Sequence, residues 1–153
     1  MQNLQFSNFK FQIKNKGFTL IEVVVVIAII GVLIAFSAVA YQSARAAGRD
    51  TKRKGDLYDV RSALEIYRTD CGQYPASLNF GGSLTGTGSC AGNTYISSVP
   101  SDPLGSGGRQ YRYSGSANTY ELCASMEQGS GTQNCGGSSV CGNSTCNFKV
   151  TNP

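Results

Sequence analysis

The stretch FTLIEVVVVIAIIGVLIAFSAVAY, residues 18–41, decides the architecture that this sequence predicts. As a helix it would be roughly 36 Å long at 1.5 Å per residue, enough to cross a hydrocarbon core of about 30 Å. It contains one charged residue, Glu22, and one helix-weakening glycine, Gly31. The stretch therefore predicts a membrane-spanning helix with a lone carboxylate near its start.

The charges on either side of this apolar stretch do not agree on its orientation. Residues 1–17 are polar and basic, and the residues soon after the stretch carry five more cations: Arg45, Arg49, Lys52, Arg53 and Lys54. A count of cations alone would put the C-terminal side in the cytoplasm. The cysteines argue for the opposite orientation.

All six cysteines follow the apolar stretch, in segments rich in Gly, Ser and Asn: Cys71, Cys90, Cys123, Cys135, Cys141 and Cys146. An even count in a small, loop-rich region indicates three disulfides and an oxidising compartment. A zinc site is the alternative, but there is no CxxC spacing and no histidine. We therefore place the C-terminal region outside the cytoplasm. A disulfide between Cys71 and Cys90 is expected, because it would tie the end of the helix to the following loop. The pairing of the other four cysteines stays open.

A second pattern continues the helix beyond Tyr41. Leu57, Val60, Leu64 and Tyr67 recur at intervals of three and four residues, which is typical of a helix packed on one side. No proline interrupts residues 41–68, and the glycine and proline of Cys71-Gly72 and Tyr74-Pro75 favour a stop. The sequence predicts one long helix to about residue 69, with a charged solvent face: Asp56, Asp59, Arg61, Glu65 and Arg68.

The remainder predicts a small antiparallel sheet. Residues 110–113 and 119–124 alternate as strands, residues 114–118 connect them, and residues 148–151 form a last strand. Residues 76–98 are expected to be a loop with a short strand at 94–96, and residues 128–147 a cysteine-bearing loop. The expected fold class is α+β, with one long N-terminal helix on a small sheet. Four tyrosines are expected to pack between helix and sheet: Tyr74, Tyr111, Tyr113 and Tyr120.

Glu22 is the most informative single residue. A carboxylate inside a membrane segment costs a few kcal/mol, so it requires a partner or a polar surrounding. If the chain were cut between Gly17 and Phe18, the new amino terminus would lie about one helical turn from Glu22. In a stack of parallel helices, Glu22 of one subunit could then neutralise the amine of the next, whereas an unpaired buried charge is very unfavourable. The simpler alternative leaves Glu22 hydrated near the headgroups.

The segment KGFTLIEVVVVIAIIGVLIA, residues 16–35, resembles the prepilin-type N-terminus of type IV pilins and type II secretion pseudopilins. Downstream, ALEIYRTDCGQYP (63–75) and VPSDPLG (99–105) resemble the helix end and the turn of pseudopilin-like proteins. The resemblance implies that a prepilin peptidase cuts after Gly17 and methylates Phe18, and that Glu22 is needed for assembly. It also implies a pilin-like fold in three parts: a cytoplasmic leader (1–17), a transmembrane and filament-core helix (18–41) and an extracytoplasmic head (42–153).

By the same resemblance, the function would be that of a structural subunit of a pilus or pseudopilus, without enzymatic activity. The expected partners are further copies of the chain, the peptidase, an assembly ATPase, a membrane platform protein and, before assembly, lipid. The expected location is the cytoplasmic (inner) membrane with one span and the head outside, and then a periplasmic or extracellular filament.

No cofactor or metal is expected. Major pseudopilins bind calcium through a C-terminal acidic loop, but after Glu121 this chain has only Glu127 as an acid. Two carboxylates are too few hard ligands for a calcium cage. The four-cysteine tail is more similar to the disulfide-closed region of type IV pilins.

Three alternatives each account for part of the sequence. A secretory signal cut after Ala40 would make the chain a secreted or single-pass anchored disulfide-rich binding protein, but the apolar stretch is too long for one. Arg45, Arg49 and Arg53 could follow DNA phosphates, as in a competence-type pilin for DNA uptake, but a solvated or subunit-facing charge band is the favoured interpretation. As an enzyme, the chain would need Asp102 and Glu121 as a pair, whereas Asp102 suits a turn and Glu121 an edge strand.

Overall fold

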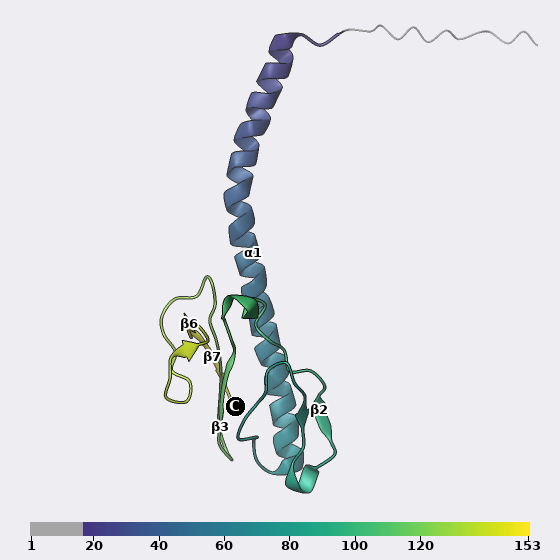
Figure 1. The fold of residues 1–153 in the computed structure, drawn as a ribbon, viewed down its shortest axis with the longest axis vertical. Helices are drawn as coiled ribbons and strands as arrows, with labels where there is room; N and C mark the ends of the chain where they lie inside the picture. The colour runs from purple at the N-terminus through teal and green to yellow at the C-terminus, as the bar shows by residue number, and fades with distance from the viewer. Residues whose placement is uncertain (1–16) are drawn as a thin grey trace, which may run out of the picture. The chain divides into compact units, whose positions relative to one another are not determined.

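One helix, α1 (Leu20–Cys71), opens the fold in the computed structural model, which describes residues 17–153 (Figure 1). The chain divides into two compact units, one ending at Ala40 and one spanning Tyr41–Pro153, which we call the head. The predicted leader lies outside the described residues except for Gly17. The prediction of a single long helix is confirmed.

α1 ends where the glycine signal predicts an end, two residues later than expected. Gly72 adopts a φ of 79°, the left-handed conformation that side chains other than glycine rarely accept. Its N–H donates to the carbonyl oxygen of Arg68 at 2.8 Å, which satisfies one of the last free carbonyls of the helix. The helix therefore stops for a local reason that is present in the sequence.

The main sheet of the head has three antiparallel strands in the order β3 (Arg112–Gly115), β4 (Tyr120–Ala124) and β7 (Phe148–Thr151). Strand β7 matches its prediction, and β3 lies two residues later than predicted. The expectation that Glu121 lies in an edge strand is wrong, because β4 pairs with β3 on one side and β7 on the other. A strand that follows a hairpin gives no sequence signal that a distant third strand will pair with its other edge.

Two smaller hairpins complete the head. β1 (Leu84–Thr85) pairs with β2 (Thr94–Ile96), and β5 (Val140–Cys141) pairs with β6 (Ser144–Thr145). Short 3₁₀ helices lie at Gly88–Cys90 and Gly105–Gly107. β2 was predicted, whereas β1, β5 and β6 lie in segments expected to be loops, since two-residue strands are too short to show an alternating pattern.

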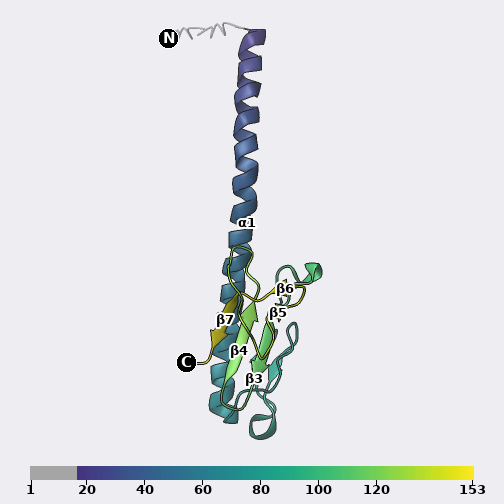
Figure 2. The ribbon, with the colours of Figure 1, turned by 90° about the vertical axis from the view of Figure 1, so that its left-hand side faces the viewer.

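The core of the head forms where the helix stripe meets the sheet. The four stripe residues are at most 3% exposed, and Leu122 of β4 and Val150 of β7 face them from the sheet. The three strands lie beside the C-terminal half of α1 in both views (Figures 1 and 2). The amphipathic pattern therefore predicted the correct buried face.

The tyrosines of this core bond to charges that we expected on the solvent face of the helix. Tyr111 donates to Asp56 at 2.7 Å, and Tyr74 and Tyr120 donate to the two oxygens of Glu65 at 2.8 and 3.0 Å. Burial, followed by the bond to Glu65, raises the pKa of Tyr120 above its usual range. The packing role predicted for the tyrosines is confirmed, but Asp56 and Glu65 are only half exposed and serve as acceptors for the core.

Candidate functional site

The first unit exposes a continuous apolar helix surface. An 18-residue window of α1 has a mean hydropathy of 3.1, and none of that window is buried. Ile27 is 60% exposed, Ile34 63% and Phe36 75%. By length and composition this segment is a candidate membrane span, and so many exposed apolar side chains mark a surface that lipid or protein covers.

Glu22 lies in the first turn of α1 and takes part in capping it. Its backbone N–H donates to Thr19 Oγ1 at 3.3 Å, and the Thr19 N–H donates back to Glu22 Oε2 at a long 3.5 Å. This reciprocal pair is a capping box, and the acid also lies favourably at the positive end of the helix dipole. Our sequence interpretation missed this local role, although the spacing Thr-x-x-Glu signals it.

Gly17 and Phe18 precede the helix and are both exposed, with Phe18 82% exposed. A side chain added at Gly17 would meet no atom within 4 Å. The bond between them is thus sterically open among the described residues, and Phe18 lies next to the capping box. The structure places Gly17, Phe18 and Glu22 within one short segment, as their spacing implies.

In the head, five charged side chains from three segments meet, and we call them the ion-pair cluster: Arg49, Asp50, Arg53, Asp102 and Glu127. Arg53 is at its centre, with a fully buried side chain. Its guanidinium bonds Asp102 through Nε at 2.8 Å and Nη2 at 3.1 Å, while Nη1 reaches Asp50 at 2.7 Å and Glu127 at 2.8 Å. The planar five-donor fork of arginine suits such multiple bonding.

The ion-pair cluster fastens two loops to α1. Asp50 accepts the backbone N–H groups of Glu127 and Gln128, both at 2.8 Å. Asp102 accepts the N–H of Leu104 at 2.7 Å, which confirms its predicted role in the turn. Because the same carboxylate is buried against Arg53, the turn interpretation was incomplete. The cluster therefore joins the helix to the Pro100–Pro103 turn and to the segment after β4.

The electrostatics of the cluster follow from these bonds. The hydrogen bond from Arg49 lowers the pKa of Glu127 to about 2, partial burial opposes this, and Arg53 contributes in the same direction as Arg49. Burial alone would lower the pKa of Arg53, but bonds to Asp102, Glu127 and Asp50 outweigh it and raise that pKa. Glu127 and Arg53 are therefore both charged at neutral pH.

This cluster corrects our interpretation of the basic stripe. Arg53 is buried and Arg49 bonds Glu127, so these two arginines are not part of a solvated or subunit-facing charge band. Among residues 17–153, the ion pairs leave only Arg45, Lys52 and Lys54 of the five cations without a carboxylate partner.

The structure joins the cysteines in three disulfides, Cys71–Cys90, Cys123–Cys135 and Cys141–Cys146. The Cα atoms of the pairs are 5.1, 6.2 and 5.1 Å apart, within the usual range for a disulfide. The first ties the end of α1 to the loop after it. The second ties β4 to the tail, and the third closes the β5–β6 hairpin.

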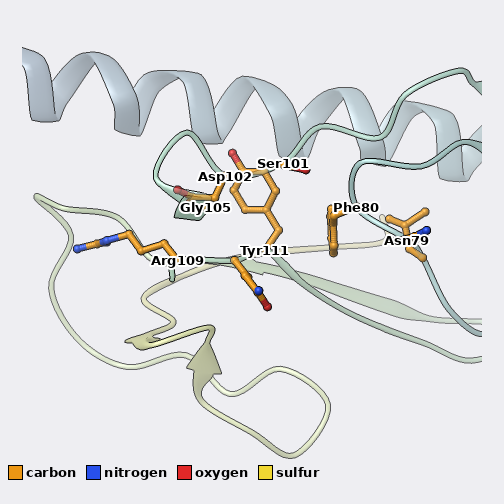
Figure 3. Close-up of a pocket in the computed structure, with 9 residues that line it drawn as sticks. Asn79, Phe80, Ser101, Asp102, Gly105, Arg109 and Tyr111 are labelled. Carbon is orange, nitrogen blue, oxygen red and sulfur yellow. The ribbon is translucent and has the colours of Figure 1, made fainter. Parts of the chain in front are cut away.

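A cavity of the head beside the main sheet brings together no catalytic set of side chains. It holds about 410 Å³ beside Phe80 and Tyr111, whose rings pack edge to face with centroids 5.6 Å apart. Asp102 lines it but is bonded to Arg53, and Arg109 donates to Ser125 (2.9 Å to its carbonyl oxygen). Figure 3 shows Arg109 extending away from the two rings. Asp102 and Glu121 are not brought together by any contact among the described residues, since Glu121 bonds Lys149.

The carboxylates of the C-terminal region do not fit a calcium ion. Glu121 bonds Lys149 at 2.8 Å and also accepts the Gly136 N–H, while Glu127 is held by Arg49 and Arg53. Within residues 17–153, no group of three or more His, Cys, Asp or Glu side chains is arranged to hold a metal ion. Lysine and arginine side chains of the same chain therefore neutralise these two acids.

Comparison with known proteins places these features in a family. Residues 13–38 match the model of the prokaryotic N-terminal methylation motif, and residues 40–139 match the model for type II secretion system (T2SS), protein G. The chain is 36% identical over 64 residues to the type II secretion system core protein G of Pseudomonas aeruginosa, covering 42% of this chain and 45% of that protein. It is 32% identical over 99 residues to the core protein G of Escherichia coli, covering 60% and 68%.

A fimbrial relative matches as well. The chain is 33% identical over 93 residues to the fimbrial protein EcpC of Eikenella corrodens, covering 61% of this chain and 58% of that protein. The chain thus spans only about half the length of the first curated relatives that it matches. None of the solved structures matches it. The protein G model nevertheless extends from the start of the head to the tail, and the chain belongs to the type II secretion system protein G family.

Proposed function

We propose that this chain is a structural subunit, without catalytic activity, that polymerises through its N-terminal helix into a type II secretion pseudopilus. One observation carries the proposal: an 18-residue window of mean hydropathy 3.1 with no part of it buried, in a chain whose head folds on a core of its own. A rod of this kind requires lipid around it before assembly and other rods afterwards. Its family membership and its fold support the same conclusion.

The proposal includes processing at the N-terminus. A prepilin peptidase would cut the exposed Gly17–Phe18 bond and methylate Phe18, leaving an amine one helical turn from Glu22. Glu22 Oε1 accepts no hydrogen bond among residues 17–153, so it is available to the amine of a neighbouring copy. Two charges that are expensive to bury alone would then neutralise each other between adjacent subunits.

The proposed orientation has the leader in the cytoplasm and the head outside, because three disulfides suit an oxidising compartment. In this arrangement the chain waits in the cytoplasmic membrane as a single-pass protein. An assembly ATPase and a membrane platform protein would supply the work that extrudes it into a periplasmic filament.

A type IV pilus is the second candidate. The disulfide-closed tail and the fimbrial relative favour it. DNA uptake by such a pilus has less support, because Arg49 and Arg53 of the basic stripe form ion pairs within the ion-pair cluster. If such a pilus binds DNA, its affinity should fall steeply as salt is added, and Arg45→Ala should weaken the binding.

Glu22 provides the test of the proposed function, because Thr19 supplies a matched control. Thr19→Ala removes the acceptor of the capping box but keeps the acid, whereas Glu22→Ala removes both the box and the charge. We expect both variants to insert into the membrane and to be cut after Gly17, as read by mass spectrometry of the N-terminus. We expect sheared, sedimentable filament from Thr19→Ala and none from Glu22→Ala.

Filaments of normal yield from Glu22→Ala would contradict the pairing of charges between subunits. A native protein that keeps residues 1–17, or that never sediments as a polymer, would contradict the proposed function itself. Deleting this chain and measuring enzyme secretion by the host separates the two candidates. If the chain forms a pseudopilus, secretion should be lost, and if it forms a pilus, secretion should continue.

A further inference from the structure

The three strands of the main sheet each contribute one side chain to a row across one face of the sheet. Arg112 of β3, Cys123 of β4 and Lys149 of β7 are register partners, so their side chains point to the same side. That side is turned away from the helix, because Leu122 and Val150, which point the opposite way, belong to the core with the helix stripe. Figure 1 accordingly shows β6, which belongs to residues 128–147, on the side of the sheet away from α1.

Residues 128–147, which we call the tail, reach this row of side chains at Cys135. Cys135 is fully buried and is joined to Cys123 by a disulfide. Its carbonyl oxygen accepts the Nε–H of Arg112 at 2.8 Å. The next residue, Gly136, has a φ of 58° and comes so close to the sheet that a Cβ there would clash with the side chain of Ser114. A covalent bond, a hydrogen bond and a close backbone contact therefore fix the same point of the tail.

An ion pair completes this attachment. Glu121 accepts the N–H of Gly136 at 2.6 Å through one carboxylate oxygen and an N–H of the Lys149 ammonium at 2.8 Å through the other. The bond from Lys149, followed by that from Gly136, lowers the pKa of Glu121, although partial burial opposes the shift. We call the whole set the tail anchor: Arg112, Glu121, Cys123, Cys135, Gly136 and Lys149.

The tail carries no charged side chain over its whole length. Calcium sites in proteins are built from several oxygen ligands, with carboxylates prominent among them. The two acids that flank the tail, Glu121 and Glu127, form ion pairs with a lysine and two arginines of the same chain. The calcium-binding acidic loop of the major pseudopilins therefore has no counterpart in the sequence of this tail.

We propose that the tail anchor, rather than a bound calcium ion, keeps the tail of this head closed on the sheet. The disulfide joins residues 12 positions apart, so it reduces the freedom of the unfolded tail. The ion pair holds Glu121 where it accepts the Gly136 N–H. The stability of the head then depends on one covalent bond and one ion pair of the chain and does not respond to calcium. The inference concerns the unassembled head and does not rest on polymerisation.

Removing calcium tests this independence. The full-length chain in detergent is melted once in excess EGTA and once in excess calcium chloride, and unfolding is followed by circular dichroism. We expect the two melting temperatures to agree within about 1 °C. A calcium ion bound at one hundred times its dissociation constant would instead raise the melting temperature by about 10 °C. A wild-type chain that melts at a clearly lower temperature in EGTA overturns the proposal.

Two variants test the two links of the tail anchor. Replacing Cys123 and Cys135 together by alanine should lower the melting temperature by about 10 °C, and Lys149→Met should lower it by about 3 °C. The matched control is Lys52→Met, which removes an exposed lysine that has no carboxylate partner among residues 17–153. The control should change the melting temperature by less than about 1 °C, and calcium should restore neither variant.

Hydrogen exchange shows whether the tail is the part that opens. We expect amides of residues 128–147 to exchange about tenfold faster in the disulfide variant and about threefold faster in Lys149→Met, while those of β4 keep their protection. If the disulfide variant does not fold, Lys149→Met still provides the test. Unchanged exchange of the tail in Lys149→Met, or recovery of either variant on adding calcium, would overturn the tail anchor. A chain that forms no filament would contradict the proposed function and leave this inference standing.

Discussion

Residues 20–40 and residues 41–71 belong to the same helix but differ in what their side chains contact. In the first segment the apolar side chains are exposed, with Ile27 at 60%. In the second, Leu57 and Leu64 are at most 1% exposed, and among the described residues no buried side-chain N or O atom lacks a partner. The polar groups buried in the head are therefore satisfied within the head, whereas the exposed apolar side chains of the first segment are not covered by any other described residue.

We expect the largest effect, complete loss of membrane association, from removing the first segment. A chain that begins at Tyr41 should lose all membrane association yet keep its three disulfides and a cooperative unfolding transition, with a free energy of unfolding within about 1 kcal/mol of the full chain in detergent. Circular dichroism against temperature and membrane flotation measure the two properties. A fragment that unfolds would show that the head depends on the apolar segment.

Loss of the ion-pair cluster should destabilise the head more than loss of an exposed cation. Arg53→Met leaves the buried carboxylate of Asp102 without its partner, so we expect a loss of about 3–5 kcal/mol in the free energy of unfolding. The exposed Arg45→Met is the control and should change it by less than about 0.5 kcal/mol. Urea unfolding of the head measures both changes. Equal losses in the free energy of unfolding would show that the ion-pair cluster stabilises the head no more than an exposed cation does.

Each disulfide should stabilise the folded head by an amount that increases with the length of chain that it closes. Cys71–Cys90 encloses a separation of 19 residues and Cys141–Cys146 one of 5. Chain entropy then predicts losses of about 3 and about 2 kcal/mol on replacing each pair by alanines. Urea midpoints of the two double variants test this order, and the reverse order would contradict the chain-entropy explanation.

Lowering the pH should gradually reduce the free energy of unfolding of the head. This is the smallest of the four expected effects. The folded pKa of Glu127 is lowered from 4.5 to about 2 by the bond from Arg49, with Arg53 adding to it, and that of Asp50 is lowered as well. A lowered carboxyl pKa stabilises the folded state above the unfolded value, and this stabilisation is lost as pH falls from about 4.5 toward 2. Unfolding followed at several pH values should show that slope, and Glu127→Gln should flatten it. An unchanged slope would place the acid sensitivity elsewhere.

The sequence predicted those features whose causes are local or periodic. The stripe from Leu57 to Tyr67 predicted the buried face of α1, Gly72 predicted its end, and the apolar stretch predicted the exposed rod. The capping box of Thr19 and Glu22 was equally local and could have been found from its spacing. The membrane orientation, the cleavage after Gly17 and the role of Glu22 in assembly stay predictions.

The fate of the charges could not be predicted in the same way. Arg53 looked like one of several exposed cations, because its main partners lie 49 and 74 positions away in the sequence. Glu121 looked like an edge-strand residue for the same reason, since the strand that covers its other side begins at Phe148. Cys123 could have paired with any of several cysteines until the strand and the tail were placed together.

From the sequence alone, one can predict an apolar helix that continues into an amphipathic one, a stop at a glycine, a few strands and a disulfide-bonded tail. Hydrophobic periodicity, helix capping and cysteine count act between residues close in the chain or through composition, so they can be read without coordinates. Which cations are buried, which cysteines join and which strands pair became clear only from the folded chain. Those outcomes depend on contacts between distant segments, and no spacing in the chain encodes them.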